Sequence, residues 1–117
     1  MNAGTKNILE MLSSRVESLC EKGEWSEAYH ASLAVVDKAR GLVELKDDGA
    51  EQALANCLEI QADVLRQTGH LEESRLIYSE ALELANKLPN NAFMLGRISA
   101  SVAVLYDSVE NEAEAIR

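Results

Sequence analysis

The sequence has few residues that break helices and few that bind anions. A single proline, Pro89, and six glycines among 117 residues permit long helices and disfavour an all-β architecture with many turns. Aromatic residues make up only 4%. Eleven lysines and arginines stand against 20 aspartates and glutamates, which gives a net charge of −9. This balance opposes binding to nucleic acid or to an anionic membrane, and it favours basic partners.

The sequence also lacks the common catalytic and ligand-binding motifs. The sequence has no glycine-rich phosphate loop, nucleophile elbow, HExxH pair or Ca²⁺ loop. His70 lies near Glu72 and Glu73, but a turn histidine beside a solvated acidic pair is a more common arrangement than a metal site. His30 is far away in the chain. We therefore expect no cofactor, no metal and no enzymatic activity.

The cysteines and the hydrophobic runs bear on the cellular compartment. Cys20 and Cys57 have no CxxC spacing, and the N-terminus carries no secretory signal, so we expect two reduced thiols in a cytoplasmic protein. Cys57 lies on an apolar helical stripe, whereas Cys20 is the more exposed of the two. No run approaches the ~18 apolar residues of a membrane span, so no membrane segment is expected.

Apolar residues, 47% of the chain, recur at intervals of three and four, which predicts amphipathic helices. Polar or glycine-containing breaks separate them. The expected helices cover residues 5–21, 25–45, 50–67, 71–88 and 91–109, with a sixth beginning at Ala113. The fifth is apolar around most of its circumference and should have neighbours on more than one side. The chain is thus expected to be all-α.

The turns of this pattern repeat. The segment Gly23–Ala28 aligns with Gly69–Ser74, 46 residues later, and with Glu110–Ala115, a further 41 residues on. An internal period of this length is typical of stacked helical hairpins.

The middle repeat resembles the tetratricopeptide repeat family. It carries the signature positions of that family in order: Ala62, Leu65, Gly69, Leu71, Glu73, Ser74, Tyr78, Ala81 and Pro89. The first and third repeats match more loosely, with Val16 in place of a small residue and Glu110 in place of the turn glycine. Offsets of 46 and 41 resemble the long-helix variant of kinesin light chains. The resemblance implies antiparallel hairpins stacked as a right-handed superhelical array, whereas an unrelated up-down bundle is the alternative.

In this interpretation residues 1–117 form one domain. Hairpin 1 covers about 5–45, hairpin 2 about 50–88, and a partial hairpin 3 covers about 91–117. Most of the second helix of hairpin 3 would fall beyond Arg117. Ile98, Val102 and Leu105 would then lack part of their cover, so we expect either a chain that self-associates or a piece of a longer repeat protein.

The resemblance also implies a binding surface. In the family, the first helix of each hairpin lines a concave face, and the positions that carry over are Ser13, Glu17, Cys20, Glu21, Glu59, Asp63, Arg66, Gln67, Arg97, Ala100, Val104 and Asp107. The family's carboxylate clamp needs lysine and asparagine where this chain has Ser13 and Glu17. The acids Glu17, Glu21, Glu59 and Asp63 instead favour a basic or amphipathic peptide or helix.

We therefore expect a protein-binding adaptor or scaffold. Three alternatives remain open at the level of sequence. The groove acids could be ordinary solvated side chains of an acidic protein. The chain could be a homo-oligomeric assembly protein that uses the apolar end of the array. It could also serve as the non-catalytic subunit of an enzyme.

Overall fold

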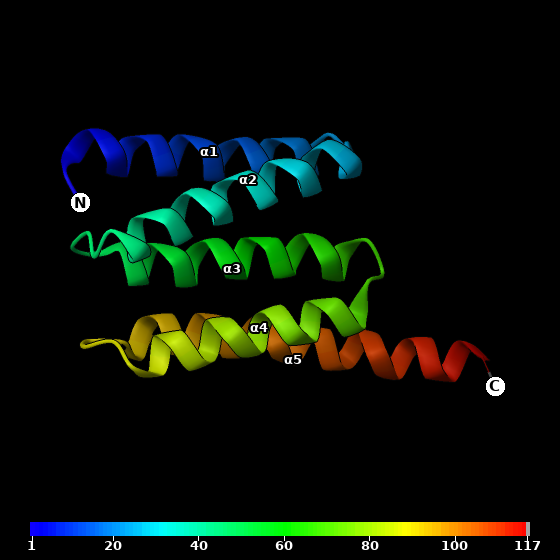
Figure 1. The fold of residues 1–117 in the computed structure, drawn as a ribbon. Coiled ribbons are helices and arrows are strands. Elements are labelled where there is room, and N and C mark those ends of the chain that lie inside the picture. Colours follow the sequence, from blue (N-terminus) through cyan, green and yellow to red (C-terminus); the bar gives the residue numbers. More distant parts are fainter. Residues whose placement is uncertain (117) are drawn as a thin grey trace.

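The computed structural model describes the backbone of residues 1–116 and the side chains through Glu110, and within this part it contains five α-helices and no strand. They are α1 (Ala3–Glu21), α2 (Trp25–Glu44), α3 (Ala50–Gln67), α4 (Leu71–Asn86) and α5 (Ala92–Ile116). Successive helices are antiparallel and follow one another across the molecule, whose extents are 51 × 30 × 20 Å (Figure 1). The all-α prediction is confirmed, and the bounds of the first four helices agree with the predicted ones to within two residues.

The turns after α1 and α3 are built alike. Gly23 and Gly69 adopt left-handed conformations, with φ of +73° and +84°, which a residue without a Cβ enters at little cost. In both turns the amide after the glycine donates to the carbonyl five residues earlier, at 2.9 Å from Glu24 and 2.8 Å from His70. These bonds satisfy carbonyls that the helix end would otherwise leave unpaired. The two aligned glycines therefore fix two equivalent helix ends.

The third predicted break is wrong. α5 continues through Glu110, Asn111 and Glu112 to Ile116, so the described chain has no sixth helix and the segment 91–117 is not a partial hairpin. The physical reason lies in the turn chemistry. Glu110 occupies the position of the turn glycine, and glutamate propagates a helix well, whereas it enters the left-handed conformation only at a cost.

α3 is the central helix of the packing. It contacts each of the other four helices. Side chains of α1, α3 and α5 line one groove, and we call these three helices a layer. α2 packs on α1 and α3, and α4 packs on α3 and α5. Within the described part of the chain, α2 and α4 make no close backbone contact with each other, although Arg40 of α2 and Glu80 of α4 form an ion pair at 2.8 Å.

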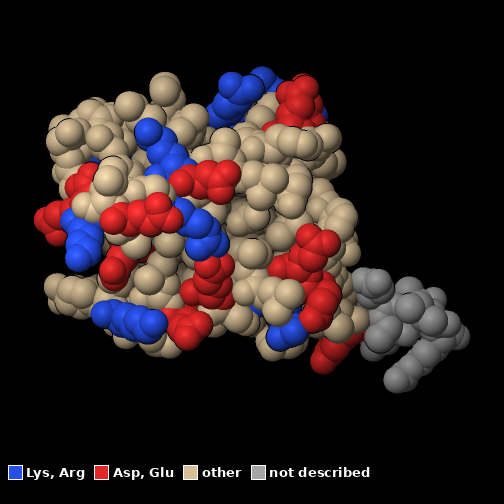
Figure 2. All heavy atoms as spheres, viewed as in Figure 1, with Lys and Arg blue, Asp and Glu red and all other residues tan. Residues whose placement is uncertain are grey.

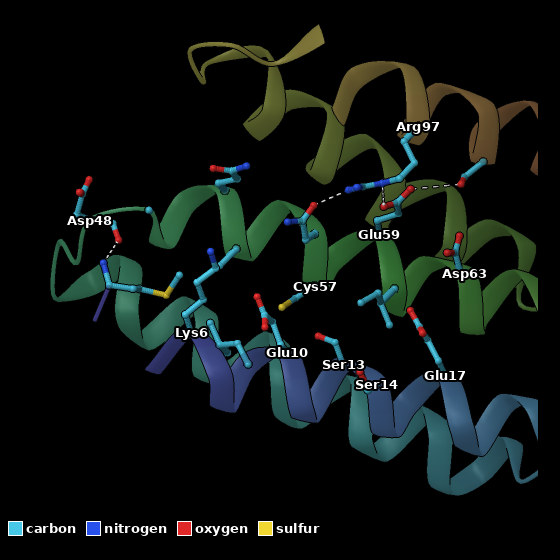
Figure 3. A pocket seen from close by; sticks show the side chains of 18 residues that line it. Lys6, Glu10, Ser13, Ser14, Glu17, Asp48, Cys57, Glu59, Asp63 and Arg97 are labelled. Carbon is cyan, nitrogen blue, oxygen red and sulfur yellow. Dashed lines mark hydrogen bonds and ion pairs between the residues drawn. The ribbon is translucent and has the colours of Figure 1, made fainter. Parts of the chain in front are cut away.

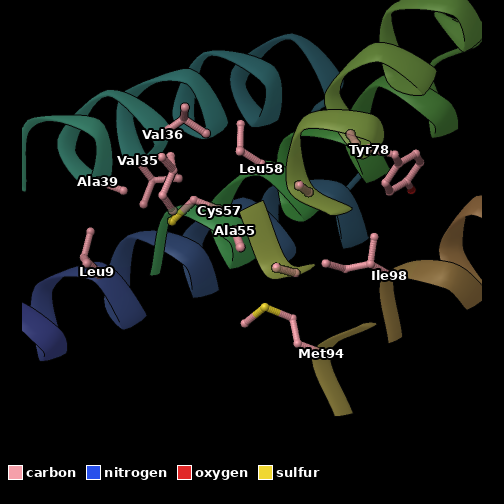
Figure 4. Close-up of a cluster of buried hydrophobic side chains, with 14 of the residues drawn as sticks. Leu9, Val35, Val36, Ala39, Ala55, Cys57, Leu58, Tyr78, Met94 and Ile98 are labelled. Atoms are coloured by element: carbon pink, nitrogen blue, oxygen red, sulfur yellow. The ribbon is translucent and has the colours of Figure 1, made fainter. Parts of the chain in front are cut away.

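The main hydrophobic core draws on all five helices (Figure 4). Leu58 of α3, Tyr78 of α4 and Ile98 of α5 are among its fully buried side chains. Leu105 of α5 is also buried, and Val102 is half-buried against the same cluster. The expectation that Ile98, Val102 and Leu105 lack part of their cover is therefore wrong for Ile98 and Leu105, which the cluster that includes α4 buries, whereas Val102 is only half-buried.

Small residues mark the closest crossing of α3 and α4. Ala62 and Ala81 are completely buried, and the buried hydroxyl of Ser74 donates to the carbonyl of Ala62 at 2.8 Å. A side-chain hydroxyl reaches the backbone of a neighbouring helix only where the two helices approach closely. Ala62, Ser74 and Ala81 therefore set the spacing of this helix pair.

We expect Ala81→Leu to lower the free energy of unfolding by ~1 to 3 kcal/mol, because the added atoms have no space at the crossing. Urea denaturation followed by circular dichroism measures the change. The matched control is Ala34→Leu on the exposed side of α2, which should change the stability by less than ~0.5 kcal/mol. Equal effects of the two substitutions would show that Ala81 does not lie at a tight crossing.

One described helix, α5 over Ala92–Glu110, is long and apolar enough to cross a membrane by length and composition alone. Mostly buried core helices of soluble proteins satisfy the same test, whereas 17% of this window is buried. In this structure the helix packs on α4 through buried side chains, and Arg97 within it forms an ion pair with Glu59 of α3. Arg97 and Asp107 would both be costly within a bilayer. The sequence-based expectation of no membrane segment therefore stays a prediction.

Candidate binding groove

The layer of α1, α3 and α5 carries a groove of about 970 Å³ (Figure 3). α1 lines one side, α3 forms the floor, and Arg97 and Ser101 of α5 line the other side. Leu9, Ala53 and Ile60 give the groove an apolar component between its charged side chains. We call this surface the α1/α3/α5 groove.

Arg97 and Glu59 join α5 to α3 across the groove. Arg97 Nε donates to Glu59 Oε1 at 2.7 Å, and a second guanidinium nitrogen donates to the side-chain oxygen of Asn56. Ser101 Oγ lies 3.4 Å from the other carboxylate oxygen of Glu59. The Glu59 side chain is only 8% exposed, whereas that of Arg97 is 41% exposed. The Glu59 carboxylate is therefore paired with a cation of the protein itself and is not available to a ligand of the groove.

Asp63 also has partners within the protein. The buried Tyr78 hydroxyl donates to Asp63 Oδ1, and Arg66 Nε donates to the Tyr78 oxygen at 3.2 Å. Burial raises the pKa of Asp63; the Tyr78 hydrogen bond opposes this shift, the nearby charge of Glu59 adds to it, and Arg66 and Arg97 oppose it. Burial and the hydrogen bond to Asp63 also raise the pKa of Tyr78. Tyr78 therefore stays a protonated donor and ties α4 to α3.

The α1 side of the groove holds charges of a different kind. Lys6, Glu10, Ser13 and Glu17 lie at spacings of four, three and four residues, so they share one helical face, and all four line the groove (Figure 3). Glu10 and Glu17 are exposed, and neither makes an ion pair with any of the side chains described, residues 1–110. On α1 they are the two acids available to a ligand; the exposed Asp48, just before α3, is a further lining acid without a side-chain ion pair among the described residues.

The structure brings together only part of the surface expected from sequence. Five expected positions line the groove: Ser13, Glu17, Glu59, Asp63 and Arg97. The other seven expected positions are not among its lining residues: Cys20, Glu21, Arg66, Gln67, Ala100, Val104 and Asp107. The negative cluster of Glu17, Glu21, Glu59 and Asp63 is therefore not present as expected, since Glu21 lies outside the groove and the two acids of α3 are paired within the protein.

Sequence reasoning missed Lys6, Glu10, Asn56 and Ser101, which also line the groove. Helical spacing alone could have found Glu10, which precedes Glu17 by seven residues, or two turns. The role of Asn56 and Ser101 depends on contacts more than 40 residues away along the chain. No local pattern reveals such contacts.

Outside the groove, the charges of opposite sign are mixed. Figure 2 shows lysine and arginine side chains among aspartates and glutamates on the face presented in Figure 1. Arg75 and Glu72 of α4 form an ion pair at 2.6 Å. The net charge of −9 is therefore not gathered into a single acidic patch on this face.

The two thiols differ in environment. Both are free cysteines; Cys57 is buried and Cys20 is half-buried, in agreement with the sequence-based expectation. Burial raises the pKa of Cys57 to about 11, and a hydrogen bond with Ser13 opposes the shift. Burial also raises the pKa of Cys20, and the nearby acids Asp63 and Glu17 add to the effect. Neither environment activates a nucleophile.

We expect Cys57 to resist alkylation in the native protein. With its pKa at about 11 instead of 9.0, the thiolate fraction at pH 8 falls by about 100-fold, and burial blocks access further. Mass spectrometry of iodoacetamide-treated protein should show Cys20 modified first and both thiols modified in urea. Modification of Cys57 at the rate of Cys20 under native conditions would contradict the burial of Cys57.

Within residues 1–110, no group of three or more His, Cys, Asp or Glu side chains is placed to hold a metal ion. No protein-family model, no curated protein and no solved structure matches the chain.

Proposed function

We propose that this protein is a protein-binding module of the tetratricopeptide repeat type, which holds a basic, amphipathic segment of its partner in the α1/α3/α5 groove. The observation that carries the proposal is the groove itself, with apolar side chains between two available acids on α1 and the paired arginine of α5. We further propose that it acts in the cytoplasm, without a cofactor and without catalytic activity of its own.

Two features support stacking of the repeat type. The turns at Gly23 and Gly69 have the same backbone conformation and hydrogen bonds, although they lie 46 residues apart. α1 contacts α3 and α3 contacts α5, whereas α2 and α4 make no close backbone contact within the described residues. A stack whose first helices are closer together than its second helices curves toward the first helices. The groove lies on that side.

The composition of the groove supports a basic and amphipathic ligand. Glu10 and Glu17 offer two carboxylates without internal partners, and the half-buried Ala53 and Ile60 offer apolar surface beside them. A helix that is apolar on one face and basic along its edge would satisfy both. Because exposed ion pairs are weak and screened, the affinity should be modest and should fall with added salt.

A direct test uses two fluorescein-labelled amphipathic peptides of 18 residues that share a leucine and alanine face and carry either lysines or glutamates on the polar face. Fluorescence anisotropy should show binding of the lysine peptide at 50 mM NaCl, weaker binding at 300 mM, and no binding of the glutamate peptide. Equal binding of both peptides, or binding that does not respond to salt, would contradict an acidic recognition groove.

A second candidate function is self-association through exposed apolar side chains of α5. Phe93, 81% exposed, and Val104 lie on one edge of the helix, whereas Tyr106, 55% exposed, and Val109 lie on the opposite edge. These side chains replace the Ile98, Val102 and Leu105 surface expected from sequence. Sedimentation velocity from 5 to 500 µM decides between the two functions. If the protein self-associates, its sedimentation coefficient should rise with concentration. The Phe93→Ser and Tyr106→Ser double variant should then keep the sedimentation coefficient of the monomer.

A further inference from the structure

We infer that the partner segment is an α-helix that places two basic side chains seven residues apart against Glu10 and Glu17. The inference rests on the proposed function and names the form and the charge register of the ligand. It follows from the separation of the two available acids, from the periodicity of the possible ligands, and from the surface between the acids.

The separation comes from helix geometry. Glu10 and Glu17 are seven residues apart on α1, which at 1.5 Å per residue places their backbone positions about 10.5 Å apart along the helix axis. Seven residues are also nearly two full turns, so both side chains lie on the same face and both line the groove (Figure 3). Ser13 lies between them, and no described basic side chain forms an ion pair with either acid. A ligand therefore meets two anchoring charges at a fixed separation.

This separation selects a helix over an extended chain. In a strand, about 10.5 Å corresponds to three residues at ~3.3 Å each. Side chains at positions i and i+3 of a strand point to opposite faces, and the same-face pairs i, i+2 and i, i+4 are ~6.6 and ~13 Å apart, so an extended peptide matches the spacing of the two acids less well. On a helix, positions i and i+7 lie on one face and have the same spacing as the two acids. A helix lying along α1 therefore matches both charges.

The surface beside the acids fits the same ligand. Leu9 of α1 and Ala53 and Ile60 of α3 also line the groove, and Ala53 and Ile60 are themselves seven residues apart. Apolar positions with this period receive the i, i+3, i+4 and i+7 side chains of an amphipathic helix. The ligand helix thus carries a basic edge that faces α1 and an apolar stripe that faces α3.

Lys6 extends the charge pattern by one more position. It lies four residues before Glu10 on the same face and lines the groove, and it makes no ion pair within residues 1–110. An acidic residue on the ligand, four positions beyond the base that meets Glu10, would face it. The full ligand pattern is therefore two bases seven residues apart, with an acid four residues outside one of them.

The experiment compares two labelled 18-residue helical peptides of identical composition, one with arginines at i and i+7 and the other with the second arginine moved to i+5, about 140° around the helix. Fluorescence anisotropy at 50 mM NaCl measures the Kd of each peptide for three proteins. They are the parent chain, the Glu10→Gln and Glu17→Gln double variant, and a Glu27→Gln and Glu83→Gln double variant. The last pair makes the same change in net charge on α2 and α4, away from the groove.

We expect the i, i+7 peptide to bind the parent about 1.4- to 5-fold more tightly than the i, i+5 peptide, because moving one arginine removes one exposed ion pair. This preference should disappear in the Glu10 and Glu17 variant and persist in the Glu27 and Glu83 variant. If the two peptides bind the parent equally and their binding still weakens with added salt, the inferred seven-residue spacing of the bases is wrong, but the proposed function is not contradicted. If neither peptide binds the parent, both the inference and the proposed function are overturned.

Discussion

Replacing Tyr78 with alanine is expected to lower the free energy of unfolding by about 3 to 5 kcal/mol, the range typical of a truncated aromatic core residue. Tyr78 is the largest fully buried side chain, with 1% exposure, and it packs in the main core shared by all five helices. Its removal leaves a cavity and also deprives Asp63 and Arg66 of the hydroxyl that lies between them. Denaturant unfolding of the purified variant measures the loss.

The variant Tyr78→Phe separates the two contributions. It keeps the ring and removes only the hydroxyl, so Asp63 loses its donor and Arg66 loses an acceptor in a partly buried setting. A cost of ~1 to 3 kcal/mol is expected for leaving such groups unpaired. The control is Tyr106→Ala on the exposed side of α5, which should cost less than ~0.5 kcal/mol. A Tyr78→Ala variant as stable as the Tyr106→Ala variant would contradict the packing of α4 on α3.

The second large effect is expected at the link between α3 and α5. Arg97→Ala leaves Glu59 charged, almost buried and without its cation, and it also removes a donor to Asn56. Breaking a buried pair in this way costs ~3 to 5 kcal/mol. Because the Arg97 side chain is 41% exposed, solvent can screen part of the loss, and we expect about 2 to 3 kcal/mol.

Two further variants distinguish a lost pair from a general effect of mutation. Glu59→Gln keeps an acceptor for Arg97 and removes the buried charge, so its cost should stay below ~1 kcal/mol. Arg75→Ala breaks the fully exposed pair with Glu72 on α4, at 2.6 Å, and should leave the stability almost unchanged. A cost for Arg97→Ala no larger than that for Arg75→Ala would mean that Glu59 does not depend on Arg97.

The first four helices could be predicted from the sequence because residues at their ends determine where each helix stops. Gly23 and Gly69 stop α1 and α3 by entering the left-handed region, and the apolar periodicity assigns the inward faces. The same reasoning failed at Glu110, where a polar run resembled a turn but lacked the glycine that makes one. A polar run alone does not end a helix whose residues have good helix propensity.

The groove could be predicted only in outline. Helix order and periodicity placed Glu17, Glu59 and Arg97 on first helices, and all three line the groove. Whether an acid is available or already paired depends on contacts across the fold, such as the one between Glu59 and Arg97, 38 residues apart in the chain. The cover of Ile98 and Leu105 has the same origin, since only the packing of α4 on α5 shows that they are buried.

The most direct test of the account is a two-dimensional ¹H–¹⁵N NMR titration of the labelled protein with the i, i+7 arginine peptide. The account predicts that the largest shift changes lie along the groove side of α1 and α3, at Glu10, Ser13, Glu17, Asn56 and Ile60. The amides of exposed residues on α2 and α4, such as Glu27 and Glu83, should move little. Changes confined to exposed residues of α5 that do not line the groove, such as Tyr106 and Val109, with none along α1, would contradict the assignment of the α1/α3/α5 groove as the binding surface.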